Sequence, residues 1–259
     1  MRPRYSSSRS GWNVAAPLHL IAGLLASACA SYATVPQEDR MTLARDLTGR
    51  RSDKFLRLSF YVSPFFGDTS KKLLSPVPPD EIRLLKQPSG EAVEPGPVER
   101  ILPAGARVRI TKVEFPTAVA LAERPLYTPR TLPWIYLHAL GELEQVPLIL
   151  VLRSGIQSSE EFLAELDRYV SDTDLDATYA RWSQVVQQAV RTKTAVIDMP
   201  AEALEMAWGY PERKQISFAN SAKQEEWVYS GERRKAHLAD GRVVRLEPGK
   251  RLEPGKAAR

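Results

Sequence analysis

The stretch FLRLSFYV occupies residues 55–62 and alternates in hydropathy along most of its length. Side chains two residues apart share one face of a β-strand, so a half-buried strand is predicted here. Its buried face would carry Leu56, Leu58, Phe60 and Val62. Twelve of the 20 prolines lie between Pro64 and Pro133, and they prevent long helices in this region. We therefore expect residues 51–155 to form a small antiparallel β domain, barrel-like or sandwich-like.

Four further strands are expected in this region. Residues 82–85 are a short candidate, and residues 107–115 are a longer one whose alternation slips by one residue near Thr111 and Lys112. Such a slip predicts a β-bulge. Residues 134–137 and 148–152 are continuously apolar, which is typical of central strands covered on both faces. The aromatic turn at residues 63–68 is expected to fold back over this core; the alternative is an exposed contact tip.

The hydrophobic period becomes helical after Gly155. One amphipathic helix is predicted from Ser158 to Val170, where Ser158 and Glu161 have the spacing of a capping box. A second is predicted from Leu175 to Val190. We expect residues 156–192 to form an antiparallel helical pair.

Residues 193–246 carry a complete start and stop signal for a short helix. Pro200 precedes the predicted helix Ala201–Ala207, and Trp208-Gly209-Tyr210-Pro211 ends it. Gly209 is expected at positive φ in a left-handed cap. Four strands should follow at residues 213–217, 226–230, 233–238 and 242–246, with a turn at residues 239–241 between the last two.

This C-terminal pattern resembles the BamE (SmpA/OmlA) family of outer-membrane lipoproteins. The residues that carry the resemblance are Trp208, Gly209 and Pro211 after the helix, and Trp227 and Tyr229 in the following strand. The sequence departs from the family pattern in having Asp198 where glycine is usual, and in lying behind a separate β domain. The resemblance implies a helix packed on an antiparallel sheet for residues 193–246. The whole chain is then of the α+β class.

The N-terminal sequence has the layout of a secretory signal peptide. An arginine-bearing start is followed by the apolar run Val14–Ala26, which is shorter than the about 20 residues needed to span a bilayer. Residues 1–28 are therefore expected to be removed after Ala28.

The only cysteine follows this cleavage position directly. The sequence Ala26-Ser27-Ala28-Cys29 resembles a bacterial lipobox, although Ala26 stands where leucine is preferred. The resemblance implies lipidation of Cys29, and Ala30 implies sorting to the outer membrane, on its periplasmic side. The alternative is a plain exported protein with a free thiol at Cys29. Residues 29–50 are then the lipidated cysteine and a polar linker.

The charge of the chain is concentrated at its two ends. The net charge is +5, but arginines in the leader and the basic tail account for it, so the body is nearly balanced. Nucleic-acid binding is not expected, because it needs a basic face and the charge of the body is nearly balanced. Residues 247–259 include most of a repeated Arg-Leu-Glu-Pro-Gly-Lys hexamer and are expected to be a disordered tail.

No metal site, cofactor site or catalytic motif is expected. Asp172, Asp174 and Asp176 have calcium-loop spacing, but the loop lacks its glycine and its final glutamate, so helix capping is preferred. His138 and His237 have no ligand partners at suitable spacing.

These observations favour a non-catalytic, lipid-anchored envelope protein that docks another envelope protein as a scaffold. The alternative is an envelope hydrolase or glycan-binding protein that uses carboxylates of the β domain, such as Glu114 or Asp68.

Overall fold

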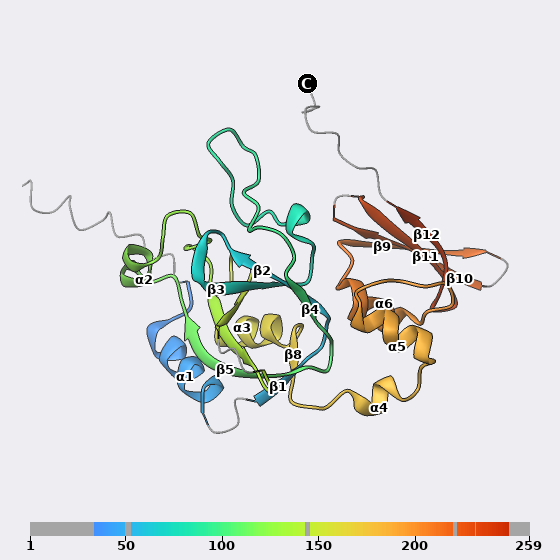
Figure 1. Ribbon diagram of the computed structural model, residues 1–259, viewed down its shortest axis with the longest axis horizontal. Coiled ribbons are helices and arrows are strands. Elements are labelled where there is room, and N and C mark those ends of the chain that lie inside the picture. The colour runs from blue at the N-terminus through green and yellow to red at the C-terminus, as the bar shows by residue number, and fades with distance from the viewer. Residues whose placement is uncertain (1–33, 50–52, 143–145, 220–221, 231, 249–259) are drawn as a thin grey trace, which may run out of the picture. The chain divides into compact units, whose positions relative to one another are not determined.

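Two sheets and six α-helices make up the described part of the chain, which is of mixed α+β class (Figure 1). The computed structural model describes residues 34–49, 53–142, 146–219, 222–230 and 232–248. All of these belong to one compact unit. The predicted signal peptide, its cleavage at Ala28 and the lipidation of Cys29 lie outside the described residues, as does the predicted tail from residue 249 onward.

The first sheet is curled and has eight strands, in the order β4-β2-β3-β7-β6-β5-β1-β8 (Figure 1). Their bounds are β1 Asp53–Leu56, β2 Phe60–Phe65, β3 Asp68–Ser75, β4 Arg100–Leu102, β5 Arg107–Glu114, β6 Trp134–Ala139, β7 Leu148–Val151 and β8 Val170–Ser171.

One strand pair corrects the expectation of an antiparallel domain, because β3 and β7 run parallel. The reason is topological. Strands β2 and β3 form a hairpin, and β5, β6 and β7 form an antiparallel meander. These two units meet through their last strands, which point in the same direction.

The stretch at residues 55–62 is buried as predicted but is not one strand. Leu56, Leu58, Phe60 and Val62 are all buried. The chain leaves the sheet between β1 and β2, because Arg57 N donates to Tyr169 O at 2.8 Å and Ser59 N donates to Met206 O at 2.8 Å. Both acceptors are more than 100 positions away, which is beyond the reach of a local hydropathy pattern.

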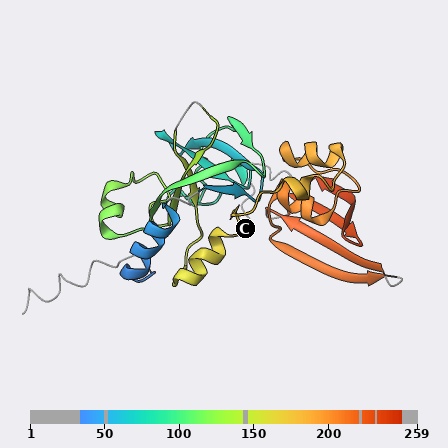
Figure 2. The same ribbon diagram turned by 90° about the horizontal axis from the view of Figure 1, so that it is seen from below.

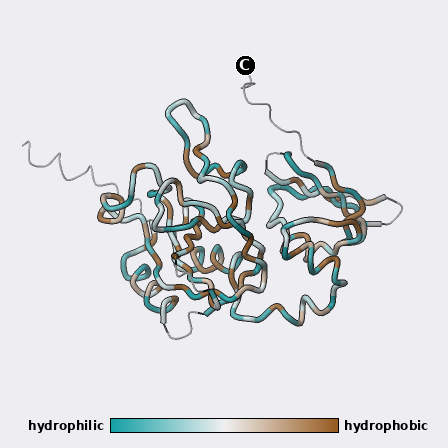
Figure 3. Tube along the Cα trace, in the orientation of Figure 1, coloured by the Kyte–Doolittle hydropathy of each residue, from teal (hydrophilic) through white to brown (hydrophobic). Residues whose placement is uncertain are grey.

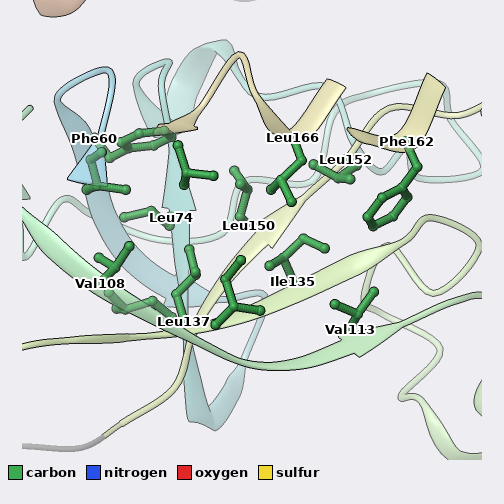
Figure 4. Close-up of a cluster of buried hydrophobic side chains, with 14 of the residues drawn as sticks. Phe60, Leu74, Val108, Val113, Ile135, Leu137, Leu150, Leu152, Phe162 and Leu166 are labelled. Carbon is green, nitrogen blue, oxygen red and sulfur yellow. The ribbon is translucent and has the colours of Figure 1, made fainter. Parts of the chain in front are cut away.

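The central strands agree with the sequence. Register shifts between Ile110 and Lys112 where β5 pairs with β6, which confirms the β-bulge. Alternate residues of β6 and β7 enter different clusters, so both faces are covered as predicted. Figure 4 shows one of these clusters, with Ile135, Leu137 and Leu150 pointing into it beside Phe162 and Leu166 from the neighbouring helix.

The aromatic turn packs in the second of these clusters, which contains Trp134 and Ile149. Phe65 and Phe66 are buried against Trp134 and Ile149, which confirms that the turn at residues 63–68 folds back on the core. Residues 82–85 form no strand. They follow a 3-10 helix, η1 (Pro79–Glu81), and Ile82 is buried from an irregular segment.

The helices are α1 Gln37–Leu47, α2 Ala118–Glu123, α3 Ser159–Leu166, α4 Asp176–Tyr179, α5 Gln184–Arg191 and α6 Ala201–Trp208. Helix α1 lies in the segment expected to be a linker, and it packs on β5 and buries Leu43. None of the helices in the described ranges is long and apolar enough to cross a membrane.

The expected antiparallel helical pair is not formed. Helix α3 buries Phe162 and Leu166 in the core of the eight-stranded sheet. Helix α5 packs on α6 and buries Val186 and Val190 in a separate core. Both predicted helices are also shorter than expected. The first ends at Leu166, before Val170 enters β8, and the second is divided into α4 and α5 by the non-helical residues 180–183.

The second sheet is antiparallel, with the order β12-β11-β10-β9. Its strands are β9 Arg213–Ala219, β10 Ala222–Tyr229, β11 Arg234–Ala239 and β12 Arg242–Pro248. The turn between β11 and β12 lies where predicted, with Asp240 and Gly241 at φ 47° and 75°. Strand β12 continues two residues into the segment expected to be a tail. The far ends of β9 and β10 reach past α5 and α6 in both views (Figures 1 and 2).

The hydrophobic residues are concentrated in two places, one for each sheet. Figure 3 shows hydrophobic segments concentrated at the centre of the eight-stranded sheet and on the helices that cover the second sheet. The long loop between η1 and β4 is mostly hydrophilic along its length.

Candidate functional site

The predicted C-terminal motif lies at the end of α6. The helix starts after Pro200 and ends at Trp208, as the sequence predicts. Gly209 caps it, and its N–H donates to Glu205 O at 2.8 Å. Its φ is positive at 87°, but its ψ of −171° is extended and not left-handed helical. Only glycine adopts this backbone conformation without strain, and Pro211 follows it closely.

The aromatic residues of the motif are core residues. Trp227 and Tyr229 are buried, and the Trp208 ring meets the Tyr229 ring edge-on at 5.3 Å between centroids. Trp227 Nε1 donates to Glu225 Oε2 at 2.9 Å, and Lys214 Nζ lies 3.9 Å from the centre of the Trp227 ring. Trp227 and Tyr229 thus lie in the core beside α6 and have little surface for a partner, and half-buried Trp208, the last residue of α6, packs against this core.

A buried lysine, which sequence reasoning missed, joins the two cores. Lys193 is 4% exposed and has φ 54°. Its ammonium donates to Ser59 O at 2.6 Å and Ala207 O at 2.8 Å. The pKa of Lys193 is lowered to about 7, chiefly by burial and also by Arg234, while Glu81 opposes the shift. Nothing in the local pattern distinguishes Lys193 from an exposed lysine at a helix end.

Ser59 completes this junction. Its Oγ donates to Val190 O at 2.6 Å and accepts from Ala104 N at 3.0 Å. Since Ser59 is fully buried and its hydroxyl already has both partners, it has the environment of a structural group and not of a nucleophile.

The carboxylates proposed for a hydrolase are held by cations. Glu114 accepts from Arg124 Nε at 2.5 Å and also contacts Lys112, and these bonds keep the pKa of Glu114 low despite burial. Asp68 accepts from Lys71 Nζ at 2.7 Å and from Ser70, and its pKa is also lowered. A general acid needs a raised pKa, so neither carboxylate has the environment of the general acid in glycoside hydrolysis.

The outward face of the second sheet has a polar hollow of about 530 Å³. It contains His237, whose Nε2 is 3.0 Å from Glu247 Oε1 and whose Nδ1 is 3.8 Å from Glu226 Oε2. Glu225 and Glu226 bond on different faces, the first to Trp227 and the second to Lys235. Among the described residues, no group of three or more His, Cys, Asp or Glu side chains is arranged to hold a metal ion.

Asp172 and Asp174, two of the aspartates with calcium-loop spacing, have protein partners. Asp174 Oδ1 accepts from Asp176 N at 2.8 Å just before α4, but the N-cap of this helix is Leu175 and no side chain caps it, so the expected helix capping by an aspartate is not formed. Asp172 contacts Lys54.

The two edges of the second sheet differ. The edge strand β12 is covered near its start, because Asp198 N donates to Val243 O at 2.7 Å and Val243 N donates to Met199 O at 2.9 Å. The edge strand β9 has no further strand beside it in the part of the chain that the structure describes. Uncovered edges are templates for added strands.

Strand β9 also exposes large apolar side chains. Ile216 is 56% exposed and Phe218 is 74% exposed. Lys214 lies on the same face, because side chains alternate along a strand, and Arg213 precedes it. Lys214 bonds to Glu205 and Arg213 to Glu232, so both cations stay at the surface near this edge.

No known protein family, curated protein or solved structure matches this chain.

Proposed function

We propose that this protein is a non-catalytic, lipid-anchored envelope protein of the outer membrane that docks another envelope protein by accepting one of its strands. The anchoring part rests on the sequence Ala26-Ser27-Ala28-Cys29. The docking part rests on one observation, the open edge of β9 with its exposed Ile216 and Phe218.

Strand addition fits this edge for two reasons. A partner strand would pair with the outward backbone groups of β9, which gives affinity without a deep pocket. Apolar side chains on the partner would cover Ile216 and Phe218 and remove their surface from water.

The chemistry of the partner follows from the charge of β9. The strand Arg213–Ala219 carries two cations and no carboxylate. Arg213 and Lys214 already pair with Glu232 and Glu205, so a carboxylate of the partner would join these surface ion pairs, while alternating apolar residues of the partner would complement the exposed face of β9. The predicted BamE-like motif supports this assembly indirectly, because Trp208, Trp227 and Tyr229 hold the sheet against α6.

Anchoring is tested with Cys29→Ser. Acyl labelling should disappear and the protein should move to the soluble periplasmic fraction, because two or more acyl chains give the stable membrane attachment. Retention of Cys29→Ser in the membrane pellet would show that some other contact is the anchor.

Docking is tested by placing a photocrosslinking amino acid at Phe218 in the full-length protein in cells. A matched control carries it at Val185, which is 65% exposed on α5. We expect a covalent adduct with one envelope protein at position 218 and none at 185. The double variant Ile216→Ser, Phe218→Ser should weaken capture about tenfold or more, because it removes two apolar anchors. Equal adducts at both positions, or none at 218, would reject docking through β9.

A further inference from the structure

The segment between β5 and β6 exposes an apolar surface that the docking proposal does not use. We call residues 116–133, which include α2, the α2 loop. Within it Val119 is 67%, Leu126 76% and Tyr127 55% exposed. The loop has three charged residues, of which only Glu123 is exposed; Arg124 is buried and Arg130 is half-buried.

The exposed side chains belong to a segment that Arg124 holds in place. Arg124 donates from Nε to Glu114 Oε1 at 2.5 Å and from Nη1 to Arg130 O and Leu132 O at 2.6 and 2.8 Å. Its guanidinium also stacks 3.8 Å from the centre of the Trp134 ring. The loop is therefore fixed to the sheet from inside, and its apolar side chains are held outward.

The α2 loop lies beside the first described residues of the chain. Thr34 and Val35 line a cavity of about 270 Å³ together with Pro116, Thr131 and Leu132, which are near the two ends of the loop. Val35 is buried, and Thr34 Oγ1 donates to Ile156 O. The start of the described chain is thus fixed next to the loop.

The distance from this point to the predicted anchor is short. Cys29 precedes Thr34 by five positions, and five residues span at most about 18 Å even when fully extended. Acyl chains on Cys29 would therefore hold Thr34, and the α2 loop beside it, close to the lipid surface.

From these observations we propose that the α2 loop is a membrane-contact surface that rests on the same leaflet as the Cys29 lipid, with Val119, Leu126 and Tyr127 in the headgroup region. This inference rests on the proposed anchoring. Two aliphatic side chains and a tyrosine suit an interface that is apolar on one side and wet on the other. Among the charged residues of the loop only Glu123 is exposed, and the loop surface differs in this from β9, which carries two cations.

The test uses the acylated full-length protein in vesicles of phosphatidylethanolamine and phosphatidylglycerol. Since lipidation occupies the only native cysteine, Leu126→Cys provides a single thiol for an environment-sensitive fluorophore. Phe218→Cys is the matched control, because Phe218 is equally apolar and similarly exposed at 74%. Nitroxide-labelled lipid should quench the probe at 126 about threefold more than at 218, since interfacial side chains sit roughly 5–10 Å into the headgroup boundary.

The outcomes separate this inference from the proposed function. Vesicle flotation with equal or weaker quenching at 126 would overturn the membrane-contact surface and leave anchoring in place. Loss of flotation in the wild-type protein would overturn both. Stronger quenching at 126 that disappears when Val119→Ser and Tyr127→Ser are added would support the contact, because a local probe artefact would persist.

Discussion

Lys193 places a cation in a position where water is excluded. Its ammonium is satisfied by two backbone oxygens, Ser59 O and Ala207 O, and lies 4.7 Å from the centre of the Tyr61 ring. Desolvation therefore dominates and lowers its pKa to about 7. An unfolded lysine keeps its proton up to about pH 10, so the unfolded chain binds more protons than the folded chain between these values.

The free energy of unfolding should consequently rise with pH above the folded pKa of Lys193. The slope should reach at most about 1.4 kcal/mol per pH unit between about pH 7 and pH 9. Lys193→Met should flatten the slope, whereas the control Lys214→Met, at a surface cation, should retain it. Urea denaturation at several pH values measures the free energy of unfolding and therefore its slope with pH. An unchanged slope in Lys193→Met would assign the pH dependence to other groups.

At the scale of elements, the α2 loop depends on one arginine. Arg124 bonds to both the side chain and the backbone of Glu114 and to two carbonyls of the loop. A buried charge of this kind is stable only while all its partners remain, and removing one partner leaves the others unsatisfied. The carboxylate that the sequence offered as a hydrolase residue is here the counter-ion of a structural arginine.

Arg124→Met should lower the free energy of unfolding by about 3 kcal/mol and release the loop. Chymotrypsin would then cleave after Leu126 and Tyr127 faster than in the wild-type protein, because a bound protease needs a locally extended chain. Arg130→Met is the control, since Arg130 makes one long bond, Nη1 to Leu121 O at 3.3 Å. Unchanged cleavage in Arg124→Met would show that other contacts hold the loop.

At the scale of the whole described unit, the two sheets share contacts that cross between their cores. Tyr179 Oη donates to Ala104 O at 2.9 Å, Ser59 N to Met206 O at 2.8 Å, and Arg234 Nη2 to Glu81 Oε2 at 3.1 Å. Each of these crossing bonds joins residues before position 110 to residues after position 175. Neither sheet can lose its structure without leaving buried polar groups of the other unpaired.

We therefore expect the two sheets to unfold together. In native-state hydrogen exchange, amides of β7 and β10 should open with free energies that agree within about 1 kcal/mol. Helix α1, which buries only Leu43, serves as an internal control and should open at a lower free energy. Exchange of β10 in denaturant that leaves β7 protected would show two independently folding parts.

The sequence alone determined the features that depend on neighbouring residues. Alternation predicted β5 with its bulge, continuous apolar runs predicted β6 and β7, and glycine and proline marked the end of α6. These signals are local because pleat, helical period and capping involve residues only a few positions apart. The leader pattern that ends at Cys29 is local in the same way and stays a prediction.

Which elements meet could not be predicted from the sequence. The break at residues 57–59, the parallel pair of β3 and β7, and the separate cores chosen by α3 and α5 all depend on partners far along the chain. The burial of Lys193 has the same origin, since its two acceptors come from distant residues. The sequence shows that an apolar face or a charged side chain must be covered or paired. Which residues cover or pair it depends on packing and hydrogen bonding in the folded chain.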